Sequence, residues 1–414
     1  MATPHAPRTQ IAAPESQGFD PRRLARIKPR MQTYVDSGNF SGITTLLARR
    51  GKIIHFDHSG VRDMASQEPL DASAIFRIYS MTKPIVCTAL MTLYEEARFH
   101  LLDPIAKYLP AFAKVKVWNG DDQPFVDPVR PILIRDLFTH TAGLTYNFLE
   151  DTPVSKMYLD AGLLSDSEAS LESVIAELAR LPLAYQPGSR WHYSMSIDVL
   201  AHLIEALSGR PLQDFLKERV FSPLGMSDTG FSVSSQNLSR VAAMYGHPDI
   251  ATHQFTDIVT SATGPVDVSK TYPTDNTTTF ARGGHGLFST AGDYLRFAQM
   301  LSNRGVLDGE RIISPAVADL MHSNHLPSNL MPYSIAIVAM PGYGFGLGSR
   351  VLMDPAAAGL PGSAGEFGWA GAANTYFWVD RQLELVGIFM TQHMISIEPA
   401  QRDFYVLAYQ ALVE

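Results

Sequence analysis

Cysteine and metal-binding patterns are almost absent from this sequence. Cys87 is the single cysteine among 414 residues, which excludes an internal disulfide and any zinc site made of several thiolates. The thirteen histidines include no His-Glu-x-x-His pattern, so a metal centre is not expected. We therefore expect a protein that works without a metal or another cofactor, with Cys87 as a small buried apolar group.

Long apolar runs and an excess of positive charge are also missing. A membrane-spanning helix needs about 18 consecutive apolar residues, and the run at 385–390, one of the longest, is far shorter. The 33 Lys and Arg residues are scattered and outnumbered by 41 Asp and Glu residues, so nucleic acid is not an expected partner. Residues 1–17 lack the apolar core of a signal peptide and predict a flexible tail and a cytoplasmic location. Nothing in the sequence indicates a particular oligomeric state.

Strand-like segments cluster at the two ends of the chain. Residues 42–49 and 52–58 are rich in β-forming residues and flank an Arg-Gly dipeptide, which predicts a hairpin. Residues 375–379 and 383–390 show the same pattern near the C-terminus. These four segments are the expected strands of the fold.

Helical periodicity dominates between these ends, with apolar residues at three- and four-residue spacing. We expect helices at 21–34 (capped by Asp20), 85–97, 171–181, 197–207, 294–301 and 404–413. The predicted fold class is α+β, with one antiparallel sheet built from about 18–95 and 335–414 and flanked by helices. A mainly helical region at about 96–334 is inserted, and a cleft is expected between the two parts of this single domain, 18–414.

Ser80 and Lys83 form the first motif that suggests chemistry, Ser-x-x-Lys. A three-residue spacing places both side chains on one face of a helix, and the Pro84 that follows indicates that Ser80 lies at the helix N-terminus. There a desolvated lysine can take the serine proton, and backbone N–H groups face developing negative charge. Lys83 is the only lysine with a serine three residues before it. A capping serine beside a solvent-exposed lysine explains the same pattern, so the motif needs support from elsewhere.

Tyr193 supplies part of that support. It lies after a Pro-Gly turn and just before the predicted helix at 197–207, in a loop of the kind that carries catalytic groups. A tyrosine close to a lysine ammonium loses its proton more easily and can act as a base. A buried core tyrosine fits the local sequence equally well.

Residues 365–372 are dense in glycine and precede a predicted strand. Glycine beside a strand lets a ligand or another backbone approach closely. A strand edge next to Ser80 can therefore offer the second N–H of an oxyanion hole. The alternative is a glycine-rich connection in which Trp369 serves as an apolar plug.

Taken in this order and spacing, the motifs resemble the serine β-lactamase and penicillin-binding-protein superfamily, specifically its class C-like branch of family VIII-type carboxylesterases. The resemblance covers residues 18–412. Four further strings of sequence agree with it: residues 140–144, 187–188, 223–226 and 283–290. It implies one catalytic domain in which Ser80 is the acylated nucleophile, and Lys83 and Tyr193 share the proton transfers. It also implies that the N–H groups of Ser80 and Ala372 hold the oxyanion.

The chain departs from the family pattern at two positions. Met195 stands where the family has the asparagine of its Tyr-x-Asn motif, and Trp369 begins Trp-Ala-Gly where the family usually has Lys-Thr-Gly. These changes remove contacts to the amide and carboxylate of an antibiotic or peptide, which favours a neutral ester. Trp-x-Gly is similar to the family's esterases and to the fungal acyltransferase that loads a side chain onto a statin precursor. We expect the substrate cleft to be lined by Tyr146, Trp191, Met195, His285, Trp369 and Gly371.

Four functions compete on these residues. The first is a serine carboxylesterase that hydrolyses small, short-chain carboxylic esters through acyl-Ser80, with a small-molecule ester as its partner. An acyltransferase to an alcohol or amine uses the same motifs and is not separated from it. β-Lactamase or D-alanyl peptidase activity is disfavoured by Met195, Trp369 and the missing export signal. Pure binding is disfavoured because a binder has no need for all three of Ser80, Lys83 and Tyr193. A Ser-His-Asp triad of the α/β-hydrolase kind is not expected either, because no serine has the Gly-x-Ser-x-Gly setting.

Overall fold

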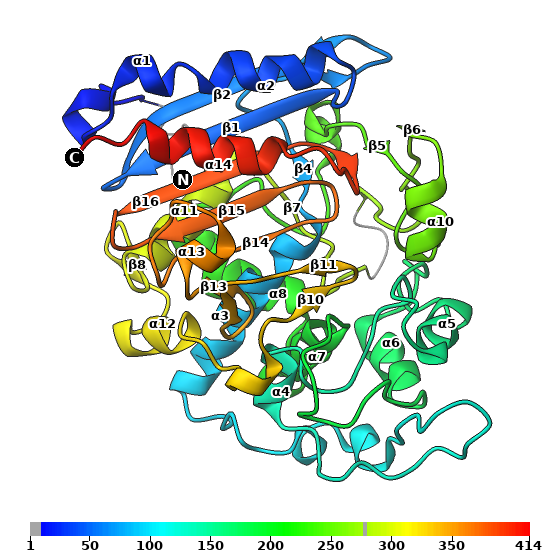
Figure 1. Ribbon diagram of the computed structural model, residues 1–414. Helices are drawn as coiled ribbons and strands as arrows, with labels where there is room; N and C mark the ends of the chain where they lie inside the picture. The colour runs from blue at the N-terminus through cyan, green and yellow to red at the C-terminus, as the bar shows by residue number, and fades with distance from the viewer. Residues whose placement is uncertain (1–9, 276–279) are drawn as a thin grey trace.

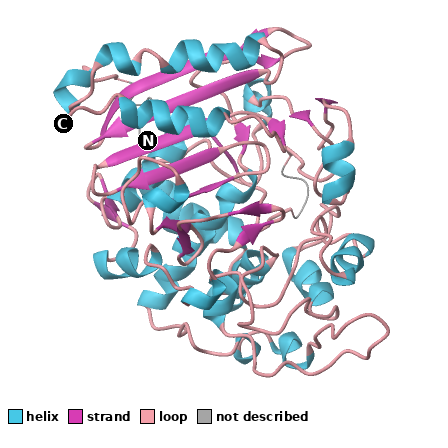
Figure 2. Ribbon diagram, viewed as in Figure 1, coloured by secondary structure: helices cyan, strands magenta, loops and turns pink. Residues whose placement is uncertain are grey.

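The computed structural model describes residues 10–275 and 280–414. Its centre is an eight-stranded antiparallel sheet, whose strands are among those drawn in magenta in Figure 2. The strand order is β12-β13-β14-β15-β16-β1-β2-β3. The strands are β1 (Gly42–Arg49), β2 (Lys52–Asp63), β3 (Glu68–Pro69), β12 (Tyr343–Phe345), β13 (Arg350–Leu352), β14 (Phe367–Ala370), β15 (Tyr376–Asp380) and β16 (Leu385–Met390). Strand β1 pairs with β16, with Thr44 opposite Met390, so the two ends of the chain join in one sheet. The predicted α+β fold class is confirmed.

Helices cover both faces of the sheet (Figure 1). Helices α2 (Ile27–Asp36) and α14 (Ala400–Gln410) pack side by side on one face, over a core that includes Trp378. Helix α11 (Ala291–Ser302) packs against β15 and β16 on the other face, where Tyr294 is wholly buried. Helix α11 belongs to the segment that the sequence predicts as an inserted helical region. In the structure, this helix packs on the sheet and forms one of its covering layers.

Helix α7 (Ser196–Ser208) shows why the middle of the chain is helical. Its apolar stripe is buried, and Gly209, with a φ of 69°, ends it in the left-handed region. It packs against the buried helix α3 (Thr82–Glu95). Among the described helices, none is long and apolar enough to cross a membrane.

Shorter elements complete the described chain. The other helices are α1 (Pro21–Leu24), α4 (Ile134–Phe138), α5 (Pro153–Asp160), α6 (Leu171–Leu178), α8 (Leu212–Leu216), α9 (Ser222–Leu224), α10 (Phe255–Thr260), α12 (Pro315–Met321) and α13 (Pro355–Ala358). The other strands are β4 (Phe76–Arg77), β5 (Tyr245–Gly246), β6 (Gly264–Pro265), β7 (Phe288–Ser289), β8 (Val306–Leu307), β9 (Glu310–Arg311), β10 (Ser334–Ile335), β11 (Val338–Ala339) and β17 (His393–Met394).

Three local details differ from the predictions. The helix expected at 21–34 is interrupted at Ala25, where α1 ends, and restarts as α2. Residues 365–372 precede β15, as predicted, but they also contain a strand of their own, β14, which completes the ladder between β13 and β15. The predicted tail is partly attached: the Ala12 N–H donates to the Ile53 carbonyl at 2.8 Å. Residues 1–9 of that tail lie outside the described residues.

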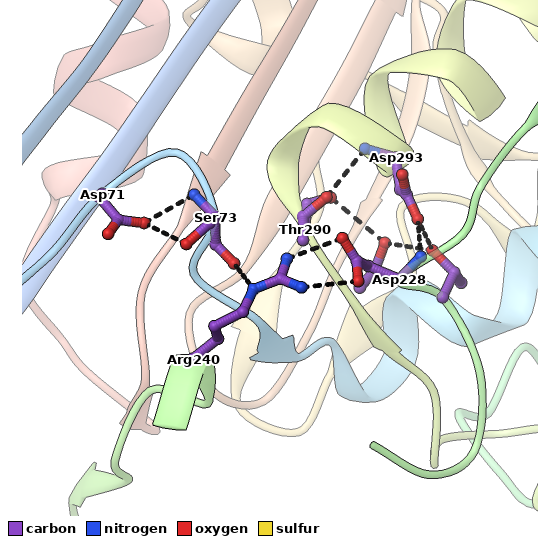
Figure 3. Close-up of polar contacts among 8 residues, drawn as sticks. Asp71, Ser73, Asp228, Arg240, Thr290 and Asp293 are labelled. Carbon is purple, nitrogen blue, oxygen red and sulfur yellow. Dashed lines mark hydrogen bonds and ion pairs between the residues drawn. The ribbon is translucent and has the colours of Figure 1, made fainter. Parts of the chain in front are cut away.

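A polar network fixes the neighbourhood of β4 and β7 (Figure 3). Arg240 donates to the Asp228 carboxylate at 2.8 and 2.7 Å and to the Ser73 carbonyl at 2.9 Å. Asp293, in the first turn of α11, accepts from the Asp228 N–H at 2.8 Å and from the Thr229 hydroxyl at 2.9 Å. Strands β4 and β7 pair with each other, so the network anchors the chain just before Ser-x-x-Lys.

Candidate active site

Ser80 lies where a short 3-10 turn, Tyr79–Met81, runs into α3. Tyr79 has a φ of 44°, in the left-handed region that costs a non-glycine residue about 1–2 kcal/mol. Burial holds it there, with its ring 4.9 Å from that of Tyr272. Because the chain then continues as a helix, Ser80 and Lys83 project from one face, as the spacing predicts.

Two side chains make hydrogen bonds to the Ser80 hydroxyl. Lys83 Nζ donates to Ser80 Oγ at 3.1 Å, and the Tyr193 hydroxyl donates to the same Oγ at 2.7 Å. Tyr193 lies 113 residues further along the chain, in the loop before α7. Lys83 Nζ is also 4.7 Å from the centroid of the Tyr193 ring. The fold therefore brings together the three residues that the sequence singles out.

Lys83 is buried and is positioned by a backbone carbonyl. Its Nζ donates to Gly284 O at 2.7 Å, and Asp198, in the first turn of α7, accepts from the Gly284 N–H at 3.0 Å. Burial raises the pKa of the Asp198 carboxyl above its ordinary value, while the Gly284 N–H and the charge of Lys83 oppose that rise. Asp198 thus anchors Gly284, the residue whose carbonyl holds Lys83 against Ser80.

Sequence reasoning missed Asp198. An acidic residue in the first turn of a helix is an ordinary stabilising feature, because it offsets the helix dipole. The available signals were its place five residues after Tyr193 and its apolar flanks, Ile197 and Val199. Neither signal is strong without the tertiary contact to Gly284.

Gly371 and Ala372 form a turn directly after β14, close to the chain that leads to Ser80. The Gly371 N–H donates to Thr375 O at 2.8 Å, and the Thr375 hydroxyl donates to Ile78 O at 3.1 Å. A Cβ atom at position 371 would lie 2.4 Å from Ile78 O, so this approach requires glycine. Within the part of the chain that the structure describes, the Ala372 N–H has no acceptor, and Ala372 lines the same cavity as Ser80.

A cavity of about 990 Å³ contains Ser80 and Tyr193 in its wall. Four of the residues predicted to line the substrate cleft also line this cavity: Tyr146, His285, Trp369 and Gly371. The centroids of the Trp369 and Tyr193 rings are 5.6 Å apart. The apolar wall therefore extends to the tyrosine that contacts the Ser80 hydroxyl. The site is therefore a large, mainly apolar chamber with a polar centre at Ser80.

Trp191 and Met195 do not line the cavity, so their predicted contact with substrate is corrected. The Trp191 ring lies 6.1 Å from that of Tyr193 with 10° between the planes, and it packs on Tyr333 at 4.2 Å. Met195 is wholly buried at the start of α7. Trp191 therefore supports the Tyr193 ring from the protein interior.

The histidines near the site are neutral wall and core groups. Burial lowers the pKa of His140 and that of His285 well below their ordinary value. His140 Nδ1 lies 3.2 Å from Ser194 Oγ, whereas His285 lines the cavity. In residues 10–275 and 280–414, no group of three or more His, Cys, Asp or Glu side chains is placed to hold a metal ion.

The sequence matches one protein family and several individual proteins. The sequence profile of the Beta-lactamase family matches residues 27–412. Protein Rv1367c of Mycobacterium tuberculosis is 37% identical over 377 residues, which is 88% of this chain and 89% of the relative. Esterase EstB of Burkholderia gladioli is 31% identical over 357 residues, covering 84% of this chain and 85% of EstB.

A solved structure agrees with these relatives. EstCE1, a hydrolase with promiscuous acyltransferase activity, superposes with a TM-score of 0.78 at 28% identity, covering 95% of this chain and 99% of EstCE1. The match extends across both the sheet and the helical region. The chain therefore belongs to the Beta-lactamase family and, within it, is similar to EstB and EstCE1.

Proposed function

We propose that this protein is a serine carboxylesterase that hydrolyses small, short-chain carboxylic esters through an acyl-Ser80 intermediate, with residues 18–414 as its single catalytic domain. The observation that carries the proposal is the convergence of Lys83 Nζ and Tyr193 OH on Ser80 Oγ, at 3.1 and 2.7 Å. The esterase EstB and the hydrolase EstCE1 support the same class of reaction.

In the acylation step, Ser80 Oγ attacks the carbonyl carbon of the ester, and its proton passes to the Lys83–Tyr193 pair. The carbonyl oxygen becomes an oxyanion, for which the N–H groups of Ser80 and Ala372 are the proposed donors. The bond to the alcohol oxygen then breaks. The alcohol leaves with the proton that the pair had taken, and the acyl group remains on Ser80.

In the deacylation step, water attacks the acyl carbon and gives one proton to the same pair. The tetrahedral intermediate collapses, the carboxylic acid leaves, and the proton returns to Ser80 Oγ. A lysine and a tyrosine that both reach Oγ can serve as base in one step and as acid in the other. Trp369, in place of a lysine, supplies an apolar wall suited to a neutral ester.

Acyl transfer to an alcohol or amine is the second candidate. It shares the acyl-Ser80 intermediate and differs in the nucleophile that attacks it. The promiscuous acyltransferase activity of EstCE1 favours it, as does a cavity of about 990 Å³, which has room for a second molecule beside the acyl group. Weak β-lactamase or D-alanyl peptidase activity ranks below both, because Trp369 offers no cation to a substrate carboxylate.

The deciding experiment measures p-nitrophenyl acetate and nitrocefin turnover side by side, with intact-mass detection of the acyl-enzyme. We expect ester turnover to exceed nitrocefin turnover, and Ser80→Ala to lose several powers of ten in rate together with the acyl adduct. Adding a primary alcohol reports transfer as a new ester. An acyl group found on another serine contradicts the proposal.

A further inference from the structure

Several exposed apolar side chains line the same cavity. Val259 in α10, Ile337 and Val338 in the β10–β11 hairpin, and Ile397 after β17 are exposed, and all four line the cavity that contains Ser80. The three segments are far apart in sequence, and the hairpin extends toward the side of the molecule that carries α10 (Figure 1). Scattered exposed apolar residues are ordinary, but a group that borders one cavity marks a binding surface.

The turn of the β10–β11 hairpin is unusual for a solvated turn. It consists of Ala336, with a φ of 49°, and Ile337, which is 84% exposed. Two-residue hairpin turns favour Asn and Gly, which tolerate the left-handed backbone. Ile397, at 88% exposure, is equally uncovered. The Ile337 and Ile397 side chains contribute a favourable free energy of burial only when an apolar partner removes them from water.

The charged side chains of the cavity wall have partners in the protein. Asp249 accepts hydrogen bonds from the Thr271 hydroxyl and from a backbone N–H. Arg350 forms a buried ion pair with Glu366 at 3.0 Å, although its Nη1 makes no hydrogen bond within the described residues. The exposed Arg402 donates to a backbone carbonyl at 3.4 Å. Because these charged side chains already bond to the protein, we expect the exposed part of the cavity to recognise a ligand mainly through apolar contacts.

The size of the cavity points to a larger ligand than a short-chain ester. Pockets for drug-sized ligands measure roughly 300–1,000 Å³, so about 990 Å³ lies at the upper end of that range. An acetyl or butanoyl ester of a small alcohol fills only a fraction of such a volume. Ser80 and the four exposed residues line this one cavity, so the remaining space is available to a group that contacts them.

We propose that the preferred substrates are esters that carry one large apolar group, an aliphatic chain of about eight carbons or a ring system of similar size. This group lies against Ile337 and Ile397 while the ester carbonyl lies at Ser80. The inference rests on the proposed esterase function and extends its substrate class beyond short-chain esters. The large group can belong to the acid or to the alcohol, and the test separates the two.

The test compares the wild type with an Ile337→Asn/Ile397→Asn double variant and with Val129→Asn as a matched control. Val129 is 79% exposed and does not line the cavity, and Asn suits exposed turns and loops. The substrates are p-nitrophenyl acetate, p-nitrophenyl octanoate and octyl acetate. We expect the double variant to lose about tenfold or more in kcat/KM on a long substrate, the factor that uncovering isoleucine side chains predicts. Val129→Asn stays within about twofold of the wild type on all three substrates, because Val129 does not line the cavity. The double variant loses less on p-nitrophenyl acetate than on a long substrate, because the short ester buries less apolar surface.

Each outcome has a defined reading. A loss confined to p-nitrophenyl octanoate places the large group in the acid, and a loss confined to octyl acetate places it in the alcohol. Unchanged kcat/KM on both long substrates, or no wild-type preference for them over p-nitrophenyl acetate, overturns the inference and leaves the esterase function intact. Failure of the wild type to hydrolyse any of the three esters overturns the proposed function itself. Unchanged melting temperatures show that the variants are folded.

Discussion

Replacing Asp198 by alanine and by asparagine tests whether this carboxylate positions Lys83. Asp198 accepts from the Gly284 N–H at 3.0 Å, and Gly284 O accepts from Lys83 Nζ at 2.7 Å. Gly284 is tightly packed, since a Cβ at position 284 would lie 2.5 Å from Asp198 Oδ2 and 2.6 Å from the Tyr146 hydroxyl. Any movement of Gly284 moves the carbonyl that accepts from Lys83.

The alanine variant leaves a buried N–H without its acceptor, which costs about 1–3 kcal/mol of stability. A displacement of about 1 Å at a catalytic group costs up to about 100-fold in rate. We therefore expect Asp198→Ala to lower kcat by about 10- to 100-fold with little change in KM. Asp198→Asn keeps an acceptor oxygen and the side-chain shape, so it restores stability and most of kcat.

The asparagine variant tests the hydrogen bond apart from the carboxylate charge, because the amide oxygen can still accept from the Gly284 N–H. Asp293 offers a matched control, because it also occupies the third position of a helix, accepts a backbone N–H and lies outside the cavity.

The assay is p-nitrophenyl acetate hydrolysis across pH, with urea unfolding of each variant. The reasoning is refuted if Asp198→Asn is as slow as Asp198→Ala, or if Asp198→Ala keeps the wild-type kcat. A stability loss in Asp198→Ala without a change in kcat assigns Asp198 a structural role only.

Three further predictions follow from the same geometry. Lys83→Ala, Tyr193→Phe and the double variant should have similar residual kcat values, because the two side chains act on one Oγ; a double loss equal to the product of the single losses contradicts this. Trp369→Ala should reduce the preference for p-nitrophenyl esters over nitrocefin, since the apolar wall is lost; an unchanged kcat/KM ratio argues against the wall. Burial raises the pKa of Asp293 to about 6, so the folded state holds a proton that the unfolded state releases near 3.8. Its contribution to stability is therefore present at low pH and lost as the pH rises through about 6, by at most about 3 kcal/mol. Asp293→Asn should remove that step from urea unfolding measured at several pH values, and a step that persists assigns it to another group.

Local sequence determined those features that depend on residues close together in the chain. The spacing of Ser80 and Lys83 places both on one helical face, whatever the rest of the fold does. The buried stripe of α7 and its end at Gly209 follow from apolar periodicity and the left-handed freedom of glycine. The β1–β2 hairpin likewise depends on a short turn between two β-forming runs.

Tertiary structure decided the contacts between distant segments. The pairing of β1 with β16, the approach of Tyr193 to Ser80 across 113 residues, and the contact of Asp198 with Gly284 all depend on how helices and sheet pack. Whether a side chain faces a cavity or the core is settled in the same way, which is why Trp191 supports Tyr193 from behind instead of lining the cleft. Residue type predicts which chemistry is available, and packing decides which atoms come within hydrogen-bonding distance. The exposed group at the cavity mouth belongs to this second category, because its three segments meet only in the folded chain.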